Sequence, residues 1–144
     1  MKIYLGSDHA GFKLKEYLKK YFDKAKIKYE DLGAFTDKKK SDYPDYATKV
    51  AKKVVKNKEK GILICGTGTG MVMAANKIKG ARAAMAYDSY SAKMSRHDND
   101  ANILCLRGRN FSFNKARNIV KIWLKEKFSN ISRHKRRIKK INKL

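Results

Sequence analysis

The stretch Gly61-Ile62-Leu63-Ile64-Cys65-Gly66-Thr67-Gly68-Thr69-Gly70-Met71 decides the fold of this chain, because an apolar run passes directly into a glycine-rich loop. The apolar residues and the glycines that bound them predict a buried strand over Gly61–Cys65. The residues after the loop predict a helix over Met71–Ile78. A strand, a tight loop and a helix in succession form the repeating unit of parallel α/β proteins.

The same alternation recurs on both sides of this stretch. Short apolar runs predict four more strands: Lys2–Gly6, Ile27–Leu32, Ala81–Ala86 and Asn102–Leu106. Apolar residues at helical spacing predict four more helices: Ala10–Phe22, Pro44 to about Asn57, Ser89–Arg96 and Phe113–Phe128. Residues 34–42 are polar and lysine-rich and predict a loop. The expected fold is a single α/β domain over residues 1–144, with a five-stranded parallel sheet and helices on both faces.

A last and very basic helix is expected over about His134–Asn142. Its apolar residues Ile138 and Ile141 are few, so we expect residues 134–144 to pack on a partner subunit. The chain has 36 Lys+Arg and 13 Asp+Glu, and its formal net charge of +23 would attract any polyanion. Because lysines are scattered along almost every predicted helix, we interpret most of this charge as solvated surface and expect no specific nucleic-acid partner. The dense run from Arg133 to Arg137 is the exception.

The sequence also limits the compartment and the cofactors. No apolar run approaches the ~20 residues of a membrane span, and the N-terminal segment is charged too early for a signal peptide. We therefore expect a cytoplasmic protein without a membrane partner. Cys65 and Cys105 both end apolar runs, which favours two reduced thiols on neighbouring strands. The histidines and cysteines lie far apart in sequence, so no zinc spacing occurs and no metal site is expected.

Three predicted strand ends carry polar or reactive residues: Ser7-Asp8-His9, Cys65 with its loop, and Arg107-Gly108-Arg109. Ligands of open α/β sheets bind beyond the carboxyl ends of the strands, so these segments should converge. The glycines of Gly66–Gly70 let backbone N–H groups point together, which makes a cradle for a phosphate or a developing oxyanion. The spacing fits neither the dinucleotide fingerprint nor a P-loop. A plain strand-to-helix turn is the alternative.

The thiol of Cys65 is the sharper feature, because nearby N–H donors favour the reactive thiolate. It could act as a nucleophile or a base, or be an ordinary buried cysteine, as we expect for Cys105. Asp8 and His9 could contact sugar and phosphate, or Asp8 could cap the following helix. Arg133 and Arg137 lie four residues apart and so share one helix face. Such a pair could bind a phosphate monoester, or it could belong to a basic surface tail or to a nucleic-acid-binding patch.

Taken together, the motifs of the chain resemble the type B ribose-5-phosphate isomerases, a family that includes galactose-6-phosphate isomerase subunits. Six segments carry the resemblance, in this order: Ser7-Asp8-His9-Ala10-Gly11, Asp42-Tyr43-Pro44, Ile64-Cys65-Gly66-Thr67-Gly68-Thr69-Gly70, Ala74-Ala75-Asn76-Lys77, Asn99-Asp100-Ala101-Asn102 and Arg133-His134-x-x-Arg137. The resemblance covers essentially the whole chain. It implies a Rossmann-like domain that works as a homodimer, or a dimer of dimers, with sites built across the interface. It also implies interconversion of ribose 5-phosphate and ribulose 5-phosphate without a metal or organic cofactor.

The resemblance implies a role for each candidate residue as well. Cys65 would be the base that moves a proton between C1 and C2, and Thr67 beside it would relay protons. The loop backbone would stabilise the enediolate. The remaining substrate contacts would be Asp8 and Asn99 at sugar oxygens, Gly66, Gly68, Thr69 and Gly70 in the loop, and His9, Arg109, Arg133 and Arg137 at the phosphate.

One position departs from the family pattern. Family members commonly carry a histidine immediately before the asparagine that matches Asn99, and it opens the furanose ring as an acid. Here that position is Asp98, and the histidine is one residue earlier, at His97. We expect one of the two to substitute, with Asp98 favoured by register if burial raises its pKa. Otherwise ring opening is slow, or the preferred substrate differs.

Two other functions are compatible with the sequence. An isomerase of a six-carbon sugar phosphate, such as allose or galactose 6-phosphate, could use the same scaffold, with residues 34–42 and Tyr43 shaping the pocket. A non-catalytic polyanion binder would draw on the net charge and the basic C-terminal helix. No aromatic residue follows Phe128 to stack on nucleic-acid bases, which disfavours the second of these functions.

Overall fold

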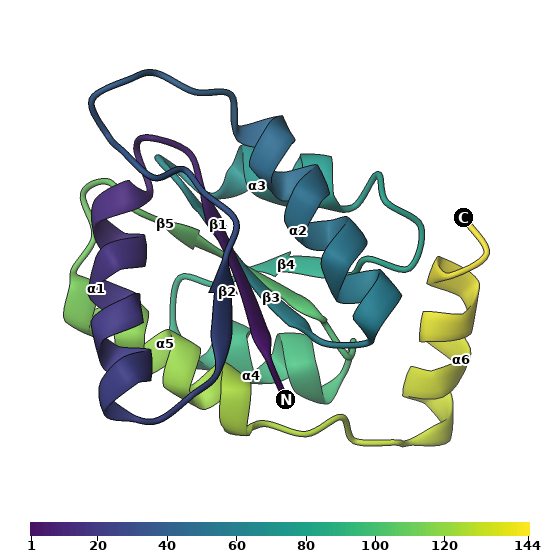
Figure 1. The fold of residues 1–144 in the computed structure, drawn as a ribbon. Helices are drawn as coiled ribbons and strands as arrows, with labels where there is room; N and C mark the ends of the chain where they lie inside the picture. Colours follow the sequence, from purple (N-terminus) through teal and green to yellow (C-terminus); the bar gives the residue numbers. More distant parts are fainter.

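Five parallel strands pair in the order β2-β1-β3-β5-β4 in the computed structural model, which describes all 144 residues (Figure 1). The strands are β1 (Ile3–Ser7), β2 (Tyr29–Asp31), β3 (Lys60–Cys65), β4 (Ala83–Met85) and β5 (Ile103–Arg107). The helices are α1 (Phe12–Lys24), α2 (Tyr43–Asn57), α3 (Thr69–Ala75), α4 (Ser89–His97), α5 (Phe113–Lys125) and α6 (Ser132–Ile141). The predicted α/β fold with a five-stranded parallel sheet is confirmed. No helix combines the length and the apolar character that a membrane crossing requires.

Helices cover both faces of the sheet, as the alternation of the strand residues requires. In β3, Ile62 and Ile64 point into a core shared with α1, α4 and α5, whereas Leu63 and Cys65 point into a core shared with α2 and α3. Figure 1 shows α1 and α5 on one side of the strands and α2 and α3 on the other. Each strand of the centre is therefore buried on both faces, as parallel sheets require.

The order of the strands places a topological switch point between β1 and β3. The chain leaves β1 for β2 on one side and returns to β3 on the other. The register pairs Ser7 with Ile64 and Cys65 with Arg107, so the carboxyl ends of β1, β3 and β5 lie side by side. A crevice at such a point is the usual ligand site of an open α/β sheet.

Several element boundaries differ from the predicted ones. β2 and β4 are shorter than expected, with only three residues each. Helix α3 begins at Thr69, two residues early, because Gly68 has a φ of 84° and turns the chain directly into the helix. Helix α5 ends at Lys125 rather than Phe128, since Glu126 has an extended backbone.

The predicted basic C-terminal helix is α6, which stands beside the body of the domain in Figure 1. Its side chains are buried only at His134 and Ile138, and Arg133 and Arg137 are exposed. A segment without helix or strand, residues 126–131, joins it to α5. The helix is thus held to its own domain by little apolar surface, and its packing on a partner subunit stays a prediction.

Candidate active site

A cavity of about 360 Å³ lies at the switch point, where β1, β3 and β5 end. The predicted convergence of the three strand ends is confirmed, since each contributes to its wall. The lining residues are Asp8, His9, Ala10, Tyr43, Cys65, Gly66, Thr67, Thr69, Gly70, Met73 and Arg109. A larger cavity of about 620 Å³ lies between the α3–β4 loop and the end of α6, but no thiol, histidine or carboxylate lines it. Chemistry therefore assigns the site to the smaller cavity.

Cys65 lies at the end of β3 with its side chain almost fully buried. The backbone N–H of Gly68 donates a hydrogen bond to its Sγ over 3.0 Å. This bond fixes the sulfur atom at the wall of the cavity, where a thiol can act as a base or a nucleophile. Cys105 does not line the cavity, and burial raises the pKa of its thiol. Both thiols are free and lie on adjacent strands, as predicted.

The loop after Cys65 exposes unpaired backbone donors to the same cavity. The N–H groups of Gly66, Thr67, Thr69 and Gly70 have no hydrogen-bond partner within the chain. The hydroxyl groups of Thr67 and Thr69 lie 2.8 Å apart and bond to one another. Free donors that surround one space are the equipment of an oxyanion hole. The loop is therefore more than a turn between β3 and α3.

Asp8 and His9 follow β1 on the opposite wall. Asp8 Oδ1 accepts the N–H of Gly11 at 3.0 Å, although the first residue of the helix is Phe12, so Asp8 secures the turn and is not its N-cap. The N–H of Ser41 donates to Nδ1 of His9 at 3.2 Å. The carbonyl oxygen of Ser41 also lies 3.3 Å from Nδ1, so Ser41 can hold this nitrogen in either tautomer, and Nε2 has no partner within the chain and is open to a ligand.

The predicted phosphate ligands divide into two groups. Arg109 lines the cavity, and its guanidinium makes no ion pair or hydrogen bond within the chain, which leaves it free for an anion. Arg133 and Arg137 lie on the exposed face of α6 and do not line the cavity. Asn99 also lies elsewhere, in the wall of the larger cavity beside α6.

His97 and Asp98 lie at the end of α4, away from the cavity, and pair with each other. Nδ1 of His97 lies 2.7 Å from Oδ1 of Asp98, whose side chain is 41% exposed. The hydrogen bond from His97 lowers the pKa of Asp98, with smaller contributions from His134 and Arg133. This direction is opposite to the raised pKa that ring opening by Asp98 would need. Asp98 is poorly suited to donate a proton and well suited to orient His97.

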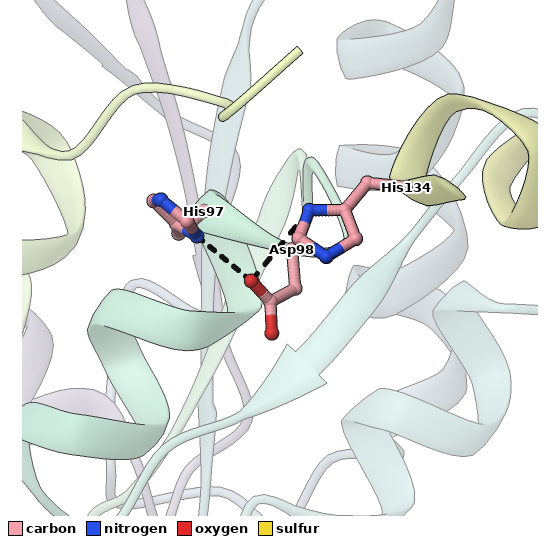
Figure 2. A group of neighbouring side chains, drawn as sticks. All are labelled: His97, Asp98 and His134. Carbon is pink, nitrogen blue, oxygen red and sulfur yellow. Dashed lines mark hydrogen bonds and ion pairs between the residues drawn. The ribbon is translucent and has the colours of Figure 1, made fainter. Parts of the chain in front are cut away.

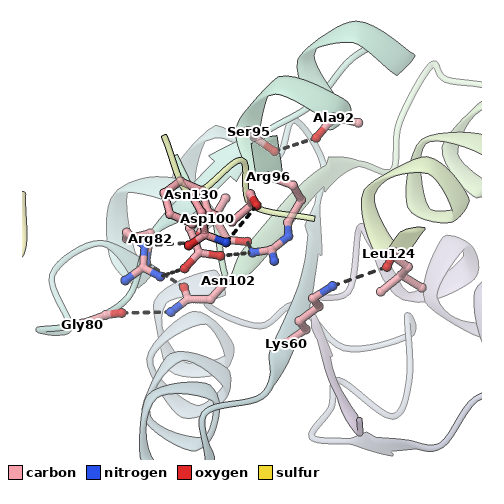
Figure 3. A network of polar contacts seen from close by, with 12 residues as sticks. Lys60, Gly80, Arg82, Ala92, Ser95, Arg96, Asp100, Asn102, Leu124 and Asn130 are labelled. Carbon is pink, nitrogen blue, oxygen red and sulfur yellow. Dashed lines mark hydrogen bonds and ion pairs between the residues drawn. The ribbon is translucent and has the colours of Figure 1, made fainter. Parts of the chain in front are cut away.

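A polar network fixes the turn in which these residues lie (Figure 3). The carboxylate of Asp100 accepts from Arg96 at 2.7 Å and from Arg82 at 2.8 Å. Asn102 donates to the carbonyl oxygen of Gly80 at 2.9 Å, which ties β5 to the α3–β4 loop. The end of α4 is thus held rigidly on the sheet, and His97 is fixed relative to β5.

Comparison with known proteins decides the family. The model of the ribose/galactose isomerase family matches residues 3–141. The chain belongs to the ribose/galactose isomerase family. Within it, a crystal structure of a ribose 5-phosphate isomerase from Thermotoga maritima is 44% identical, with a TM-score of 0.95 and coverage of 99% of this chain and 98% of that one.

Two further family members bear on the ligand. Ribose-5-phosphate isomerase B from Mycoplasma genitalium, solved with bound ribulose-5-phosphate, is 41% identical, with a TM-score of 0.93 and coverage of 99% of this chain and 94% of that one. D-erythrulose-4-phosphate isomerase 2 from Mycolicibacterium smegmatis is 41% identical over 127 residues, which are 86% of this chain and 84% of the relative. The family thus includes proteins named for sugars of different length.

Sequence reasoning placed Tyr43 at the pocket but missed the part that Ser41 plays in holding His9. Ser41 holds His9 through its N–H and also accepts the N–H of His9 on its hydroxyl at 3.0 Å. No local signal marks this contact, because Ser41 lies 32 residues from His9 in the sequence. Tyr43 lines the cavity, and a Cβ on Gly70 would come within 2.7 Å of its ring. A glycine is thus required where the loop passes the tyrosine.

Proposed function

We propose that this chain interconverts ribose 5-phosphate and ribulose 5-phosphate through an enediolate. One observation carries the proposal: a buried thiol, four unpaired N–H groups and a free guanidinium line one cavity. An aldose–ketose isomerase needs a base, donors for a developing oxyanion, and a cation for the phosphate. The bound ribulose-5-phosphate of the Mycoplasma genitalium relative supports the substrate class.

In the proposed reaction, the thiolate of Cys65 removes the proton from C2 of the aldose. The electron pair moves to form the C1–C2 double bond, and negative charge collects on O1. The N–H groups of Gly66–Gly70 stabilise that charge where it develops. The thiol then returns the proton to C1, while the hydroxyl proton moves from O2 to O1 with Thr67 as the relay. The reaction moves two protons and one electron pair within the substrate and needs no metal or organic cofactor.

The two ends of the substrate then follow from the positions of the polar groups. Asp8, whose Oδ2 has no partner, accepts a sugar hydroxyl, and Thr69 lies across the cavity from it. His9 and Arg109 bind the phosphate, His9 through Nε2 and Arg109 through its unpaired guanidinium.

The proposal includes a homodimer. Arg133, Arg137 and Asn99 do not line the cavity of their own chain, and α6 packs on its own domain with only two buried side chains. A second copy that places its α6 against the cavity would supply the two arginines to the phosphate and give the helix the partner that its composition requires. A dimer of dimers is a larger version of the same arrangement. Free thiols on adjacent buried strands fit the proposed cytoplasmic location.

His97 does not line the cavity of its own chain, so the proposed acid of ring opening is His97 of the second copy in the homodimer, with Asp98 as the group that orients it. The carboxylate holds Nδ1 of His97, so Nε2 is the atom that exchanges a proton with the ring oxygen. This assignment reverses the register-based preference for Asp98. It follows from the lowered pKa of Asp98, which keeps that carboxylate ionised.

A four-carbon substrate is the second candidate. An aldose with its phosphate on O4 cannot close a furanose ring, so it needs no ring-opening acid. The displaced histidine of this chain and the Mycolicibacterium smegmatis relative named for D-erythrulose 4-phosphate both favour it. A six-carbon sugar phosphate would need a deeper pocket, and the ring of Tyr43 against Gly70 bounds the cavity.

The test is the specificity constant kcat/KM of the wild-type protein on ribose 5-phosphate, erythrose 4-phosphate, and allose and galactose 6-phosphates. The proposal predicts the highest value for ribose 5-phosphate. A tenfold or larger preference for erythrose 4-phosphate would replace it with the second candidate, since about 1.4 kcal/mol of transition-state binding would then favour the shorter sugar. No turnover of any of the four would overturn the isomerase assignment.

A further inference from the structure

The three residues His97, Asp98 and His134 converge on one point between α4 and α6 (Figure 2). One ligand atom from each lies within 4.8 Å of the other two. Nδ1 of His97 is 2.7 Å and Nδ1 of His134 is 3.7 Å from the same oxygen, Oδ1 of Asp98. None of the three lines the cavity of the proposed reaction in its own chain.

We propose that His97, Asp98 and His134 form a binding site for a divalent transition-metal ion of the zinc class. Two imidazole nitrogens and one carboxylate oxygen are a three-ligand set that Zn²⁺ accepts, with water in the fourth position. Tetrahedral ligands with metal bonds of about 2.0–2.1 Å are separated by about 3.3 Å. The separations of 2.7 and 3.7 Å bracket that value, so small side-chain rotations complete the geometry.

The backbone prepares this arrangement before any ion arrives. The N–H of Ser129, in the segment that leads to α6, donates to the carbonyl oxygen of His97 at 3.0 Å. His134 is only 3% exposed and its ring packs edge-on against His97, with centroids 6.0 Å apart. The two histidines therefore face one another from separate segments without a large entropic cost on binding. Asp98 remains 41% exposed, which gives an ion and its water access from solvent.

One contact competes with the ion. The hydroxyl of Ser129 lies 2.7 Å from Nδ1 of His134 and must release that nitrogen. It can do so cheaply, because it already accepts the N–H of Ile131 at 3.3 Å. The Ser129 contact makes a prediction that a purely structural cluster would not make: its removal should tighten metal binding.

The surroundings select the class of ion. Arg133 acts electrostatically on Asp98, and the chain as a whole carries a charge of +23, so a cation held by one carboxylate alone would be repelled. For a borderline ion such as Zn²⁺ or Co²⁺, the bonds to the two nitrogen ligands compensate for this repulsion. Mg²⁺ and Ca²⁺ prefer oxygen ligands and gain little here.

The test is titration of the substrate-free protein with Co²⁺, followed by visible absorption, and with Zn²⁺ by calorimetry, so the result does not rest on the proposed function. Wild type should bind one Co²⁺ per chain with a tetrahedral spectrum, and Zn²⁺ should displace it. Mg²⁺ should give neither heat nor competition. Asp98→Asn keeps the size of an exposed side chain and should weaken Co²⁺ binding at least about tenfold, as should His134→Ala.

Two variants control for other ligands and for misfolding. Cys65→Ala removes the thiol that could otherwise bind Co²⁺ and should leave the affinity unchanged. Ser129→Ala should bind Co²⁺ more tightly than wild type, which loss of structure cannot produce. Wild-type absorption without tetrahedral bands would overturn the proposal. The proposal would also fail if Asp98→Asn bound Co²⁺ with an affinity within about twofold of wild type, or if Cys65→Ala no longer bound Co²⁺. Either result would mean that the ligands lie elsewhere.

Discussion

The backbone N–H of Gly68 donates to Sγ of Cys65 over 3.0 Å, and it does so from a left-handed conformation with φ of 84°. The loop therefore holds the thiol at the edge of the cavity by a bond that only this backbone shape allows. A Cβ at Gly68 would lie 2.4 Å from Met85 and 2.9 Å from the carbonyl oxygen of Leu106. Both the conformation and the space require glycine.

Gly68→Ala should therefore lower kcat about 10²-fold by displacing the N–H that holds the Cys65 thiol, and destabilise the fold by about 1–2 kcal/mol of backbone strain. Gly66→Ala is the matched control, because its Cβ would have ordinary contact at 3.4 Å with the Arg109 side chain. Steady-state kinetics and urea unfolding measure both effects. Equal kinetic losses in the two variants would argue against a special role for the Gly68 donor.

The acid of ring opening can be separated from the rest of the machinery by the choice of sugar. His97→Ala should lower turnover of ribose 5-phosphate about 10²-fold, because the furanose must open before the base can act. It should leave turnover of erythrose 4-phosphate nearly unchanged, because that sugar cannot form the ring. Asp98→Asn should have a smaller effect of the same kind. Equal losses on both sugars in His97→Ala would remove this role from His97.

A site shared between subunits predicts complementation between inactive variants. Cys65→Ala lacks the base and Arg137→Ala lacks a phosphate ligand from the other chain, so each homodimer should be nearly inactive. When the two are unfolded together and refolded, half of the dimers are mixed and each mixed dimer has one intact site. Activity should recover to about one quarter of wild type. A mixture no more active than the mean of its components would contradict the shared site.

Lys60, at the opposite end of β3 from the cavity, makes stability depend on alkaline pH. Burial, followed by the charge of Arg96, lowers the pKa of Lys60 from 10.5 to about 8. Between these values the unfolded chain binds the proton and the native chain does not, so stability rises with pH. The stability that the native chain gains when Lys60 is neutral in both states is fully present above pH 10.5. It is lost as the pH falls towards 8.

Lys60→Met should consequently raise the free energy of unfolding at neutral pH by about 1 kcal/mol, after allowance for partial exposure. The gain should vanish as the pH approaches 10.5, where the native and unfolded wild-type chains both lose the proton. Urea unfolding at several pH values measures the difference, with the exposed Lys52→Met as the control. A gain that does not change with pH would contradict this account.

The central part of the fold and site was predictable because its signals are local. The apolar run before Cys65 and the glycines after it define β3, the loop and the start of α3 within one short segment. The same logic places Asp8 and Arg109 after strands, and parallel topology brings strand ends together. These predictions needed no knowledge of which strands are neighbours.

The parts that sequence could not supply depend on contacts between distant segments. The position of β5 between β3 and β4 follows from pairing across the chain, and the bond between His9 and Ser41 joins residues 32 apart. Ring opening by Asp98 would need a raised pKa, yet the pKa of Asp98 is lowered, because the neighbouring His97 ring turns its Nδ1 towards the carboxylate. Side-chain direction of this kind is set by tertiary structure and not by sequence spacing.

The most direct test of the account is isomerisation of ribose 5-phosphate in D₂O by wild type and by Cys65→Ala, with NMR of both the product and the proton at C2. A base that forms an enediolate exchanges that proton with solvent, so wild type should show turnover together with deuterium incorporation. Cys65→Ala should retain the fold and bind the sugar phosphate, but lose turnover and exchange together by about 10³-fold or more. Exchange at the wild-type rate in Cys65→Ala would contradict the assignment of Cys65 as the base.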